Sequence, residues 1–424
     1  MAKGASDSNL DTTNPRRRLQ QIQSALADVQ HVLDLPDGLS VSLRTRSQDY
    51  DGTRIWRSTI SIGSNRAVLE FSVLPREAAL VLSALGTPFE KNPTEPRFPV
   101  LELEFLSDSA SGIDAELKNA DMWAGIYALW TLLHVQEVIP ITIKNSHPSV
   151  ISYLLKSGLA RRALDPNVSE LFLLRSAFWQ GAGQGPLWDN SRGWLRYTAD
   201  YVPFPHIPSF TRSSLVIAQH PLRPPKPPPG QTIYARYVKP IGKVLAFHMI
   251  DVGSKDDMDA FHRWMNDPRV HAGWGEAGDE EKHRRYVRGM MDEPSVLPLV
   301  MSWDGERMGY AELVWIKENH VATYVPGIGA QDYDRGLHVL VGEDKYRGHE
   351  FSQAWFRSLT HYMFLADPRT WRIIGEPKRI NGPIIRTSED AGMHLETKSF
   401  YFPYKHSVMT MNLRERLFKE DMYL

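Results

Sequence analysis

The feature that most constrains the fold is a proline-dense stretch near the middle of the chain. Residues 201–210 read YVPFPHIPSF and residues 220–230 read HPLRPPKPPPG. Each proline fixes its φ angle and lacks an N–H donor, so such a stretch cannot form a helix interior or a central strand. We therefore expect residues 200–240 to be an extended linker or strap between two domains.

The length of the chain fits this division, since 424 residues is long for a single domain. We expect residues 1–38 to be a polar, partly disordered segment with a short helix over 16–34. A first domain is expected over 39–199 and a second over 241–424.

Composition excludes several classes of function. The formal net charge of −1 gives no general attraction to nucleic acid or to an anionic membrane. There is no cysteine, which excludes disulfides, thiolate nucleophiles and cysteine-ligated metals, and the histidines lack metal-ligand spacing. Without an apolar leader or a run of roughly 20 apolar residues, the sequence predicts a cytoplasmic protein that binds no membrane.

Both halves show the patterns of a mixed α/β fold. In the first half, alternating residues over 39–107 predict strands and hairpins, and MWAGIYALWTLL predicts a buried helix. The remaining elements of the first half are expected as a strand over 139–145, a helix over 146–160 and a strand over 169–180. The second half is expected to contain a hairpin around Pro240–Gly242, helices over 259–270, 280–292, 349–365 and 381–393, and strands over 295–304, 309–318, 320–327, 337–342, 371–377, 395–403 and 404–415.

The two halves share an order of elements. In each, a strand follows a long aromatic helix, an Asn precedes the next helix, and a Gly closes that helix. This shared order of elements indicates a degenerate internal duplication, and the alternative is two unrelated α/β segments.

One stretch of the second half has the pattern of an anion site. The apolar run LHVLVG carries one histidine, His338, and is followed by a charged turn with Gly348 and then by a long helix. The unpaired N–H groups of a helix's first turn, with the positive end of the helix dipole, attract anions. We expect the backbone amides of residues 346–350 to form this cradle, although many α/β proteins have such turns without a ligand.

The wider context resembles the GNAT superfamily of acetyl-CoA-dependent N-acetyltransferases. The segments FHRWMNDPRVHAGW, GYAELVWIKE, DRGLHVLVGE, ADPRTWRIIGEP with Asn381, and KSFYFPYKHSVM together resemble the siderophore-biosynthesis N-acyltransferases. The resemblance covers about residues 240–415, and length and the preceding half are similar to the fungal hydroxyornithine acyltransferases. It implies a catalytic GNAT-like domain over 241–424 and a non-catalytic, degenerate GNAT-like domain over 39–199.

The resemblance also implies the reaction. The chain would transfer an acyl group from acyl-CoA to the hydroxylated side-chain amine of N5-hydroxy-L-ornithine, giving a hydroxamate by direct transfer. Acetyl-CoA or a longer donor such as anhydromevalonyl-CoA would be a co-substrate, with no permanent cofactor and no metal. Relatives of this kind imply a cytoplasmic or peroxisomal location, and either a monomer with two pseudo-dimeric domains or a homodimer.

Site residues follow from the same resemblance. His338 is expected to be the general base and Glu376 to orient it or to bind the acceptor amine; a packed strand histidine and a solvated carboxylate are the alternatives. Acyl-CoA is expected to contact Val341, Gly342, Lys345, Tyr346, Arg347, Gly348, His349 and Glu350. The acceptor is expected to contact Trp274, Trp315, Arg335, Asn381 and Lys405, although core packing, ion pairing and helix capping are alternative roles for them.

Two positions depart from the related sequences. The turn is usually Q/R-x-x-G-x-G/A, whereas this chain has Lys345 at its start and Glu350 at its end. Some bacterial relatives carry an acid where this chain has Lys378. Alternative functions are a non-catalytic GNAT-like scaffold, an acyltransferase of an ordinary amine, and one of N6-hydroxylysine.

Overall fold

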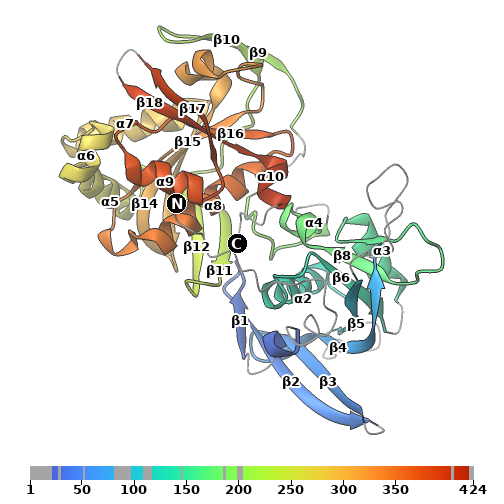
Figure 1. Cartoon of the computed structure of the whole chain (residues 1–424). Coiled ribbons are helices and arrows are strands. Elements are labelled where there is room, and N and C mark those ends of the chain that lie inside the picture. Colours follow the sequence, from blue (N-terminus) through green and yellow to red (C-terminus); the bar gives the residue numbers. More distant parts are fainter. Residues whose placement is uncertain are drawn as a thin grey trace. The chain divides into compact units, whose positions relative to one another are not determined.

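The computed structural model describes residues 22–26, 30–50, 53–80, 97–107, 117–144, 147–184, 188–197, 204–402 and 405–419 (Figure 1). The chain divides into two compact units between Gly193 and Trp194. Each unit contains its own large sheet with helices, so the expected mixed α/β class is confirmed.

The first unit is built on an eight-stranded sheet with the order β1-β2-β3-β4-β5-β6-β8-β7. Neighbouring strands are antiparallel except β5 and β6, which are parallel. Its strands are β1 (His31–Asp34), β2 (Ser40–Tyr50), β3 (Thr53–Ile62), β4 (Arg66–Ala79), β5 (Arg97–Phe105), β6 (Val138–Ile143), β7 (Ala160–Arg162) and β8 (Leu171–Leu174), and its helices are α2 (Asn119–Leu132), α3 (Pro148–Lys156) and α4 (Arg175–Trp179).

Two predicted elements of this unit are wrong in part. The helix expected over 16–34 is helical at 22–26, whereas His31–Asp34 forms β1, because pairing with β2 buries Val32 and Leu33. The strand expected over 169–180 ends at Leu174, and α4 follows it. Residues 16–21 lie outside the described part of the chain. The expected buried helix is confirmed as α2, which is apolar and buried almost all round.

The second unit repeats this architecture. Its eight-stranded sheet has the order β11-β12-β13-β14-β15-β16-β18-β17, and here β15 and β16 are the parallel neighbours. The strands are β11 (Thr232–Val238), β12 (Lys243–Met249), β13 (Val296–Trp303), β14 (Glu306–Trp315), β15 (Arg335–Val341), β16 (Arg372–Gly375), β17 (His394–Tyr401) and β18 (His406–Leu413). Its helices are α5 (Lys255–Met265), α6 (Pro268–Trp274), α7 (Glu280–Asp292), α8 (His349–Ala366), α9 (Gly382–Asp390) and α10 (Arg414–Lys419), with short 3-10 helices η3 (Ile316–Glu318), η4 (His320–Tyr324) and η5 (Asp344–Tyr346). The shared strand order is the result that an internal duplication predicts.

Local chemistry explains where the second unit differs from expectation. The helix expected over 259–270 is two helices, because Asp267 accepts a hydrogen bond from the N–H of Arg269 and Pro268 begins α6. The strand expected over 320–327 is instead η4, which the side chain of Asn319 caps at the N–H of Val321.

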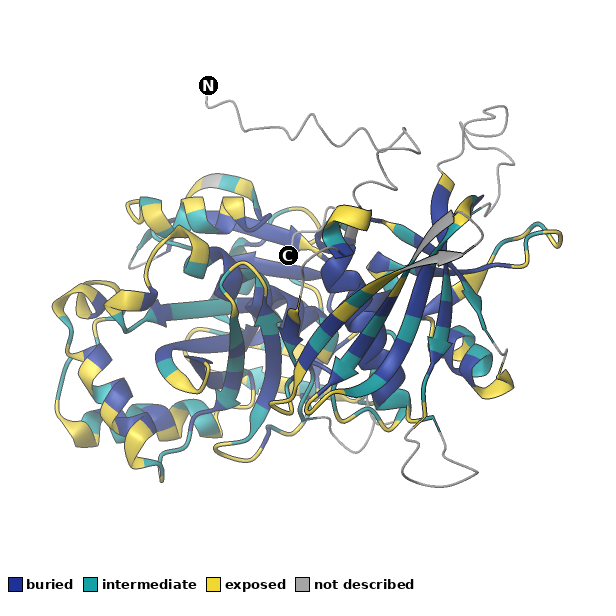
Figure 2. Cartoon of the chain, turned by 90° about the horizontal axis from the view of Figure 1, so that it is seen from below, coloured by how far each residue is buried: buried dark blue, intermediate teal, exposed yellow. Residues whose placement is uncertain are grey.

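Helices cover both faces of the second sheet. Side chains of α5 and α7 pack with Val300, Tyr310 and Leu340 on one face. On the other face, α8 contributes Ser358 and His361, which bond to Arg236 and Tyr234 of β11. Figure 2 shows the buried residues following the strands, while the exposed residues gather on loops and on the outer sides of helices.

The parallel pair of the second unit separates along its length. β15 pairs with β16 only at Arg335–Ile373 and Gly336–Ile374, and then continues to Val341 without it. In the first unit, β5 and β6 pair at Leu101–Ile141 through Leu103–Ile143, and Ile143 is the last residue of β6. The edge of β15 from Leu337 to Val341 therefore has no parallel partner strand, and we call this unpaired edge the wedge.

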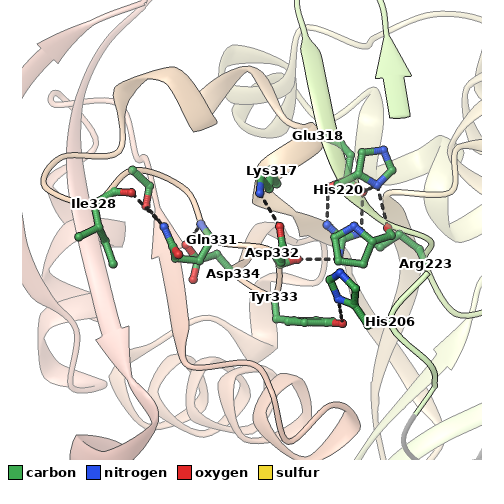
Figure 3. A network of polar contacts seen from close by, with 12 residues as sticks. His206, His220, Arg223, Lys317, Glu318, Ile328, Gln331, Asp332, Tyr333 and Asp334 are labelled. Carbon is green, nitrogen blue, oxygen red and sulfur yellow. Dashed lines mark hydrogen bonds and ion pairs between the residues drawn. The ribbon is translucent and has the colours of Figure 1, made fainter. Parts of the chain in front are cut away.

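The proline-dense stretch belongs to the second unit. Residues 208–212 and 217–221 form a separate two-stranded sheet of β9 (Pro208–Arg212) and β10 (Ile217–Pro221), and the extended segment after it leads into β11. Figure 3 shows its anchor, where the buried Glu318 accepts from Arg223 Nε at 2.5 Å and pairs with His220. Lys226 donates to the carbonyls of Met290, Met291 and Glu293 at the end of α7. The stretch is thus a strap tied to its own unit, and residues 200–203 are outside the described part.

Candidate functional site

His338 lies at the centre of a group of charged side chains on one face of the second sheet. It is the middle residue of β15, and the register of the sheet places Glu312 of β14 directly opposite. Its Nδ1 lies 3.1 Å from Glu312 Oε2, and its Nε2 lies 3.2 Å from Glu376 Oε1. Both ring nitrogens therefore face a carboxylate.

Two tyrosine hydroxyls, one from α7 and one from β14 itself, hold the side chain of Glu312. Its carboxylate accepts hydrogen bonds from Tyr286 Oη at 2.6 Å and Tyr310 Oη at 3.1 Å. Burial, together with the negative charge of Glu312, raises the pKa of both tyrosines, so they stay protonated and act as donors. Both hydroxyls donate to Oε1, which leaves Oε2 to face His338.

Glu376 follows the last residue of β16, where the chain turns away at Pro377. Lys405 Nζ lies 3.1 Å from its Oε1 and also donates to its backbone carbonyl. Burial alone would raise the pKa of Glu376, but the hydrogen bonds and charges of His338 and Lys405 lower it overall. This carboxyl is therefore ionised at neutral pH.

The two carboxylates determine the charge of His338. Burial by itself would lower the pKa of the imidazole, but the hydrogen bonds and charges of Glu312 and Glu376 raise it to about 10. Near neutral pH the ring is then an imidazolium, and together with Lys405 it balances the two carboxylates. In this state His338 holds a proton rather than offering an empty site for one.

His338 is the accessible member of the group. Its side chain is 34% exposed, whereas those of Glu312 and Glu376 are 5% and 9% exposed. The ring of Trp274, at the end of α6, stands edge-on to His338 at 6.5 Å and to Tyr310 at 5.7 Å. Lys378 donates to the carbonyl of Gly273 at 3.3 Å, which ties the turn after β16 to the end of α6, where Trp274 lies.

His320 is a second histidine beside the group. Burial lowers the pKa of His320. The negative charge of Glu376 opposes this effect, while the positive charges of Lys405 and His338 add to it. Its ring packs against Phe402 at 5.1 Å, and the same Phe402 ring lies 5.1 Å from Lys405 Nζ. This side of the site therefore carries a neutral imidazole and an aromatic ring.

Sequence reasoning missed Glu312, Tyr286, Tyr310 and His320. A signal for Glu312 was present, because it is a single carboxylate in the apolar run GYAELVW, and a carboxylate on a buried strand needs donors. No local signal pointed to Tyr286, because its contact with Glu312 depends on how α7 packs on the sheet, which the sequence pattern does not predict.

The predicted anion turn leads from β15 into α8 as expected. Gly342 is required by packing, since a Cβ there would lie 2.2 Å from the ring of Trp264. Gly348 is required by conformation rather than by space, since it has a φ of 130° and an added Cβ would meet nothing within 4 Å. It precedes the first helical residue, and the carbonyl of Gly348 accepts the bond from the N–H of Ser352.

The amides of this turn divide into two groups. Those of Tyr346 and Arg347 already donate to the carbonyls of Glu343 and Asp344. The N–H groups of residues 349–351 belong to the first turn of α8, which has no acceptor within the helix. The N–H groups best placed to bind an anion are thus those of residues 349–351, whereas the predicted cradle was residues 346–350.

The charged side chains of the turn are exposed and paired. Lys345 forms an ion pair with Glu306, and Arg347 pairs with Asp344 at 3.2 Å. His349 lies 3.8 Å from Asp390, and Glu350 is exposed in the first turn of α8. Exposed ion pairs of this kind contribute little to stability, so an incoming anion can replace their partners at low cost. Val341 ends β15 beside this turn.

Other predicted acceptor contacts are divided between the two faces of the sheet. Trp274 lies beside His338, and Lys405 lies beside Glu376. Arg335 and Trp315 are directly opposite each other in the register, on the face that α8 covers. The guanidinium of Arg335 stacks 4.0 Å from the Trp315 ring, Arg223 stacks 4.3 Å from that ring, and burial lowers the pKa of Arg335 to about 10. Asn381 caps α9 through the N–H of Ile384, the capping role already considered for it.

In the described part of the chain, no helix is long and apolar enough to cross a membrane. The same residues contain no group of three or more His, Asp or Glu side chains arranged to hold a metal ion.

Comparison with known proteins identifies related sequences. Residues 254–399 match the acetyltransferase (GNAT) domain family. Acyltransferase ato1 of Omphalotus olearius is 39% identical over 72% of this chain and 78% of its own length. The N(5)-hydroxyornithine:cis-anhydromevalonyl coenzyme A-N(5)-transacylase of Beauveria bassiana is 33% identical over 76% of each chain. The N(6)-hydroxylysine O-acetyltransferase of Escherichia coli is 36% identical over 58% of this chain and 71% of its own length.

Proposed function

Because the chain belongs to the GNAT acyltransferase family that includes the fungal hydroxyornithine transacylases, we propose that it acylates the hydroxylated side-chain amine of N5-hydroxy-L-ornithine, with acyl-CoA as donor. The product is a hydroxamate, the iron-binding group of many siderophores. The observation that carries the proposal is His338, which lies between two carboxylates beside the open wedge of β15 and β16.

The wedge and the turn suit a donor with a diphosphate and a thioester. The first-turn N–H groups of α8 and the positive end of its dipole attract the diphosphate of coenzyme A. The unpaired edge of β15 from Leu337 to Val341 offers backbone groups to the pantetheine amides. This path leads from the turn toward His338, which is the direction in which the thioester must lie.

The charges at His338 suit an acceptor that is neutral at physiological pH. A hydroxylamine is much less basic than an alkylamine, so its nitrogen keeps a free electron pair near neutral pH. An ordinary side-chain ammonium would form an ion pair with Glu376 and have no electron pair for attack. Glu376 therefore favours the hydroxylated amine as the reactive acceptor.

The transfer is direct. The acceptor nitrogen attacks the thioester carbonyl carbon, the C–N bond forms, and the C–S bond breaks with its electron pair moving to sulfur. The nitrogen loses a proton to the His338–Glu376 pair, and the departing thiolate takes up a proton. Because attack makes a hydroxylamine nitrogen strongly acidic, its proton can pass to the His338–Glu376 pair once the imidazolium has released its own Nε2 proton to solvent.

The test is to identify the product formed by the full chain. Acetyl-CoA or anhydromevalonyl-CoA is incubated with N5-hydroxy-L-ornithine, and the product is mixed with iron(III), which gives a coloured complex with a hydroxamate. The proposal expects a coloured product with the mass of the acylated acceptor. The same mass without colour means acylation on oxygen, the reaction in the name of the E. coli relative, and contradicts N-acylation. No acylated product with either donor contradicts the proposal as a whole.

A further inference from the structure

Glu312 is a buried carboxylate that the reaction as described above does not use. It lies on the central strand β14, and its side chain is only 5% exposed. Three donors converge on it: Tyr286 Oη at 2.6 Å, Tyr310 Oη at 3.1 Å and His338 Nδ1 at 3.1 Å. A buried carboxylate with three hydrogen bonds is fixed in place.

The identity of these partners fixes the protons of His338. An ionised carboxylate has no proton to donate, so the contact with Nδ1 is a hydrogen bond only when Nδ1 carries the proton. The tyrosine hydroxyls cannot replace that proton because they already donate to the other oxygen, Oε1. Nδ1 is therefore occupied in both the neutral and the charged form of the ring.

The other ring nitrogen has a different environment. Nε2 lies 3.2 Å from Glu376, whose carboxylate also pairs with Lys405 Nζ at 3.1 Å. Glu376 follows the strand that separates from β15, at the wedge itself. A proton between Nε2 and Glu376 can thus exchange with a molecule that enters there, whereas the proton on Nδ1 cannot.

We propose that Glu312, supported by Tyr286 and Tyr310, is a positioning residue that holds His338 in the Nδ1–H form and thereby makes Nε2 the nitrogen that exchanges protons with the acceptor. This inference rests on the proposed acyl transfer. It gives Glu312 the role of the carboxylate in a Ser-His-Asp triad, which orients a histidine and stabilises the imidazolium that forms. Glu376 then acts on the acceptor side of the ring.

The proton balance follows from this arrangement. The acceptor enters between Nε2 and Glu376, and the Nε2 proton of the free site leaves to solvent. During attack the acceptor N–H proton moves to Nε2, which restores the imidazolium between two carboxylates. That proton then passes to the thiolate of coenzyme A as the C–S bond breaks. The imidazolium of the free site thus has the same protonation state as the ring just after it has accepted the proton of the acceptor.

The decisive variant is Glu312→Gln in the full chain. An amide has nearly the same shape but lacks the charge, and its NH2 group can face Nδ1, which favours the Nε2–H form. We expect kcat to fall by about 10²–10⁴-fold, as for the equivalent change in a triad, with the KM for acyl-CoA unchanged. The pKa of His338 is expected to fall by about 1–3 units, because an adjacent negative charge is lost.

The tautomer itself is read from the ¹⁵N chemical shifts of histidine-labelled protein, assigned with a His338→Gln sample. Wild type is expected to show a protonated Nδ1 at every pH at which it is folded, and Glu312→Gln to lose this signature. Tyr286→Phe is the matched control, since it removes one donor but leaves the carboxylate; it should retain the Nδ1–H signature and lose less than about 10-fold in kcat.

The outcomes separate this inference from the proposed function. A wild-type protein that acylates hydroxyornithine but carries its neutral proton on Nε2 overturns the inference alone. A Glu312→Gln protein with an unchanged tautomer and kcat within about 3-fold of wild type also overturns it. If Glu312→Gln does not fold, the wild-type spectrum decides, because a neutral ring without a proton on Nδ1 contradicts the inference directly.

Discussion

At the scale of single residues, the site depends on which charges surround one imidazole. The sequence marks His338 because it is a polar residue in an apolar run, and its placement in the middle of a strand was predictable. Its two carboxylate partners come from β14 and from the end of β16, so only the register of the sheet reveals them. Alternation alone does predict that Arg335 and His338, three residues apart, point to opposite faces.

The raised pKa of His338 predicts how stability depends on pH. A group whose folded pKa lies above its unfolded value stabilises the protein below the unfolded value, and this stabilisation is lost as pH rises through the folded value. For His338 the window runs from about 6.5 to about 10. The difference in free energy of unfolding between wild type and His338→Gln should therefore shrink as pH rises across this window.

Urea unfolding at pH 6.5 and pH 9.5 checks this expectation. Between these two pH values, the stability advantage of wild type over His338→Gln is expected to shrink by about 1–2 kcal/mol. This is less than the full pKa shift of His338 implies, because a third of the side chain contacts solvent. His394→Gln is the control, since His394 pairs with the similarly exposed Glu396, and its loss should change stability little at either pH. A wild-type advantage that grows with pH would contradict the assigned charge of His338.

At the scale of elements, the turn from β15 into α8 joins the binding of an anion to the placement of the histidine. Periodicity and the two glycines predict the helix from residue 349 almost to its observed end. The break at Asp267–Pro268 and the 3-10 helix η4 were less predictable, because short capping interactions outweigh the apolar pattern in both. Which amides of the turn remain available also depends on η5, a turn too short to infer from sequence.

Gly348 tests the role of the turn. A φ of 130° is costly for any residue with a Cβ, so Gly348→Ala should alter the start of α8 and displace the amides that follow. We expect the KM for acyl-CoA to rise by about 10-fold or more, with the KM for the acceptor changing less than about 2-fold. Steady-state kinetics with each substrate varied in turn gives both values.

Gly242→Ala is the matched control for this variant. Gly242 also has a positive φ, of 69°, but it lies in the hairpin between β11 and β12. Both variants should lose about 1–3 kcal/mol of stability. Equal effects of the two variants on the KM for acyl-CoA would show that the turn before α8 has no special role in binding the donor.

At the scale of the whole molecule, the chain carries one strand order twice, with a wedge in the second unit. The repeated order of elements was predictable from the sequence, because each half has a strand, a helix, a glycine and terminal strands in the same order. The wedge was not visible, because it depends on where the pairing of β15 and β16 stops. In the described part of the first unit, β5 and β6 remain paired to the last residue of β6.

This difference predicts where a donor binds. Hydrogen exchange of the full chain with and without acetyl-CoA should show slower exchange in residues 337–352, since amides of β15 and α8 would be covered. Peptides that cover the equivalent strands of the first unit, over 97–105 and 138–143, should be unchanged. Protection of the first unit's strands to the same degree would contradict a single donor site in the second unit.

The account as a whole claims that this acyltransferase selects a hydroxylated amine. The most direct measurement is the initial rate of coenzyme A release from acetyl-CoA by the full chain at pH 7.5, with N5-hydroxy-L-ornithine or L-ornithine as acceptor at equal concentration. The account predicts a rate at least about 100-fold higher with the hydroxylated acceptor, because its nitrogen is neutral beside Glu376 and that of ornithine is charged. Equal rates with the two acceptors, or a higher rate with ornithine, would contradict it.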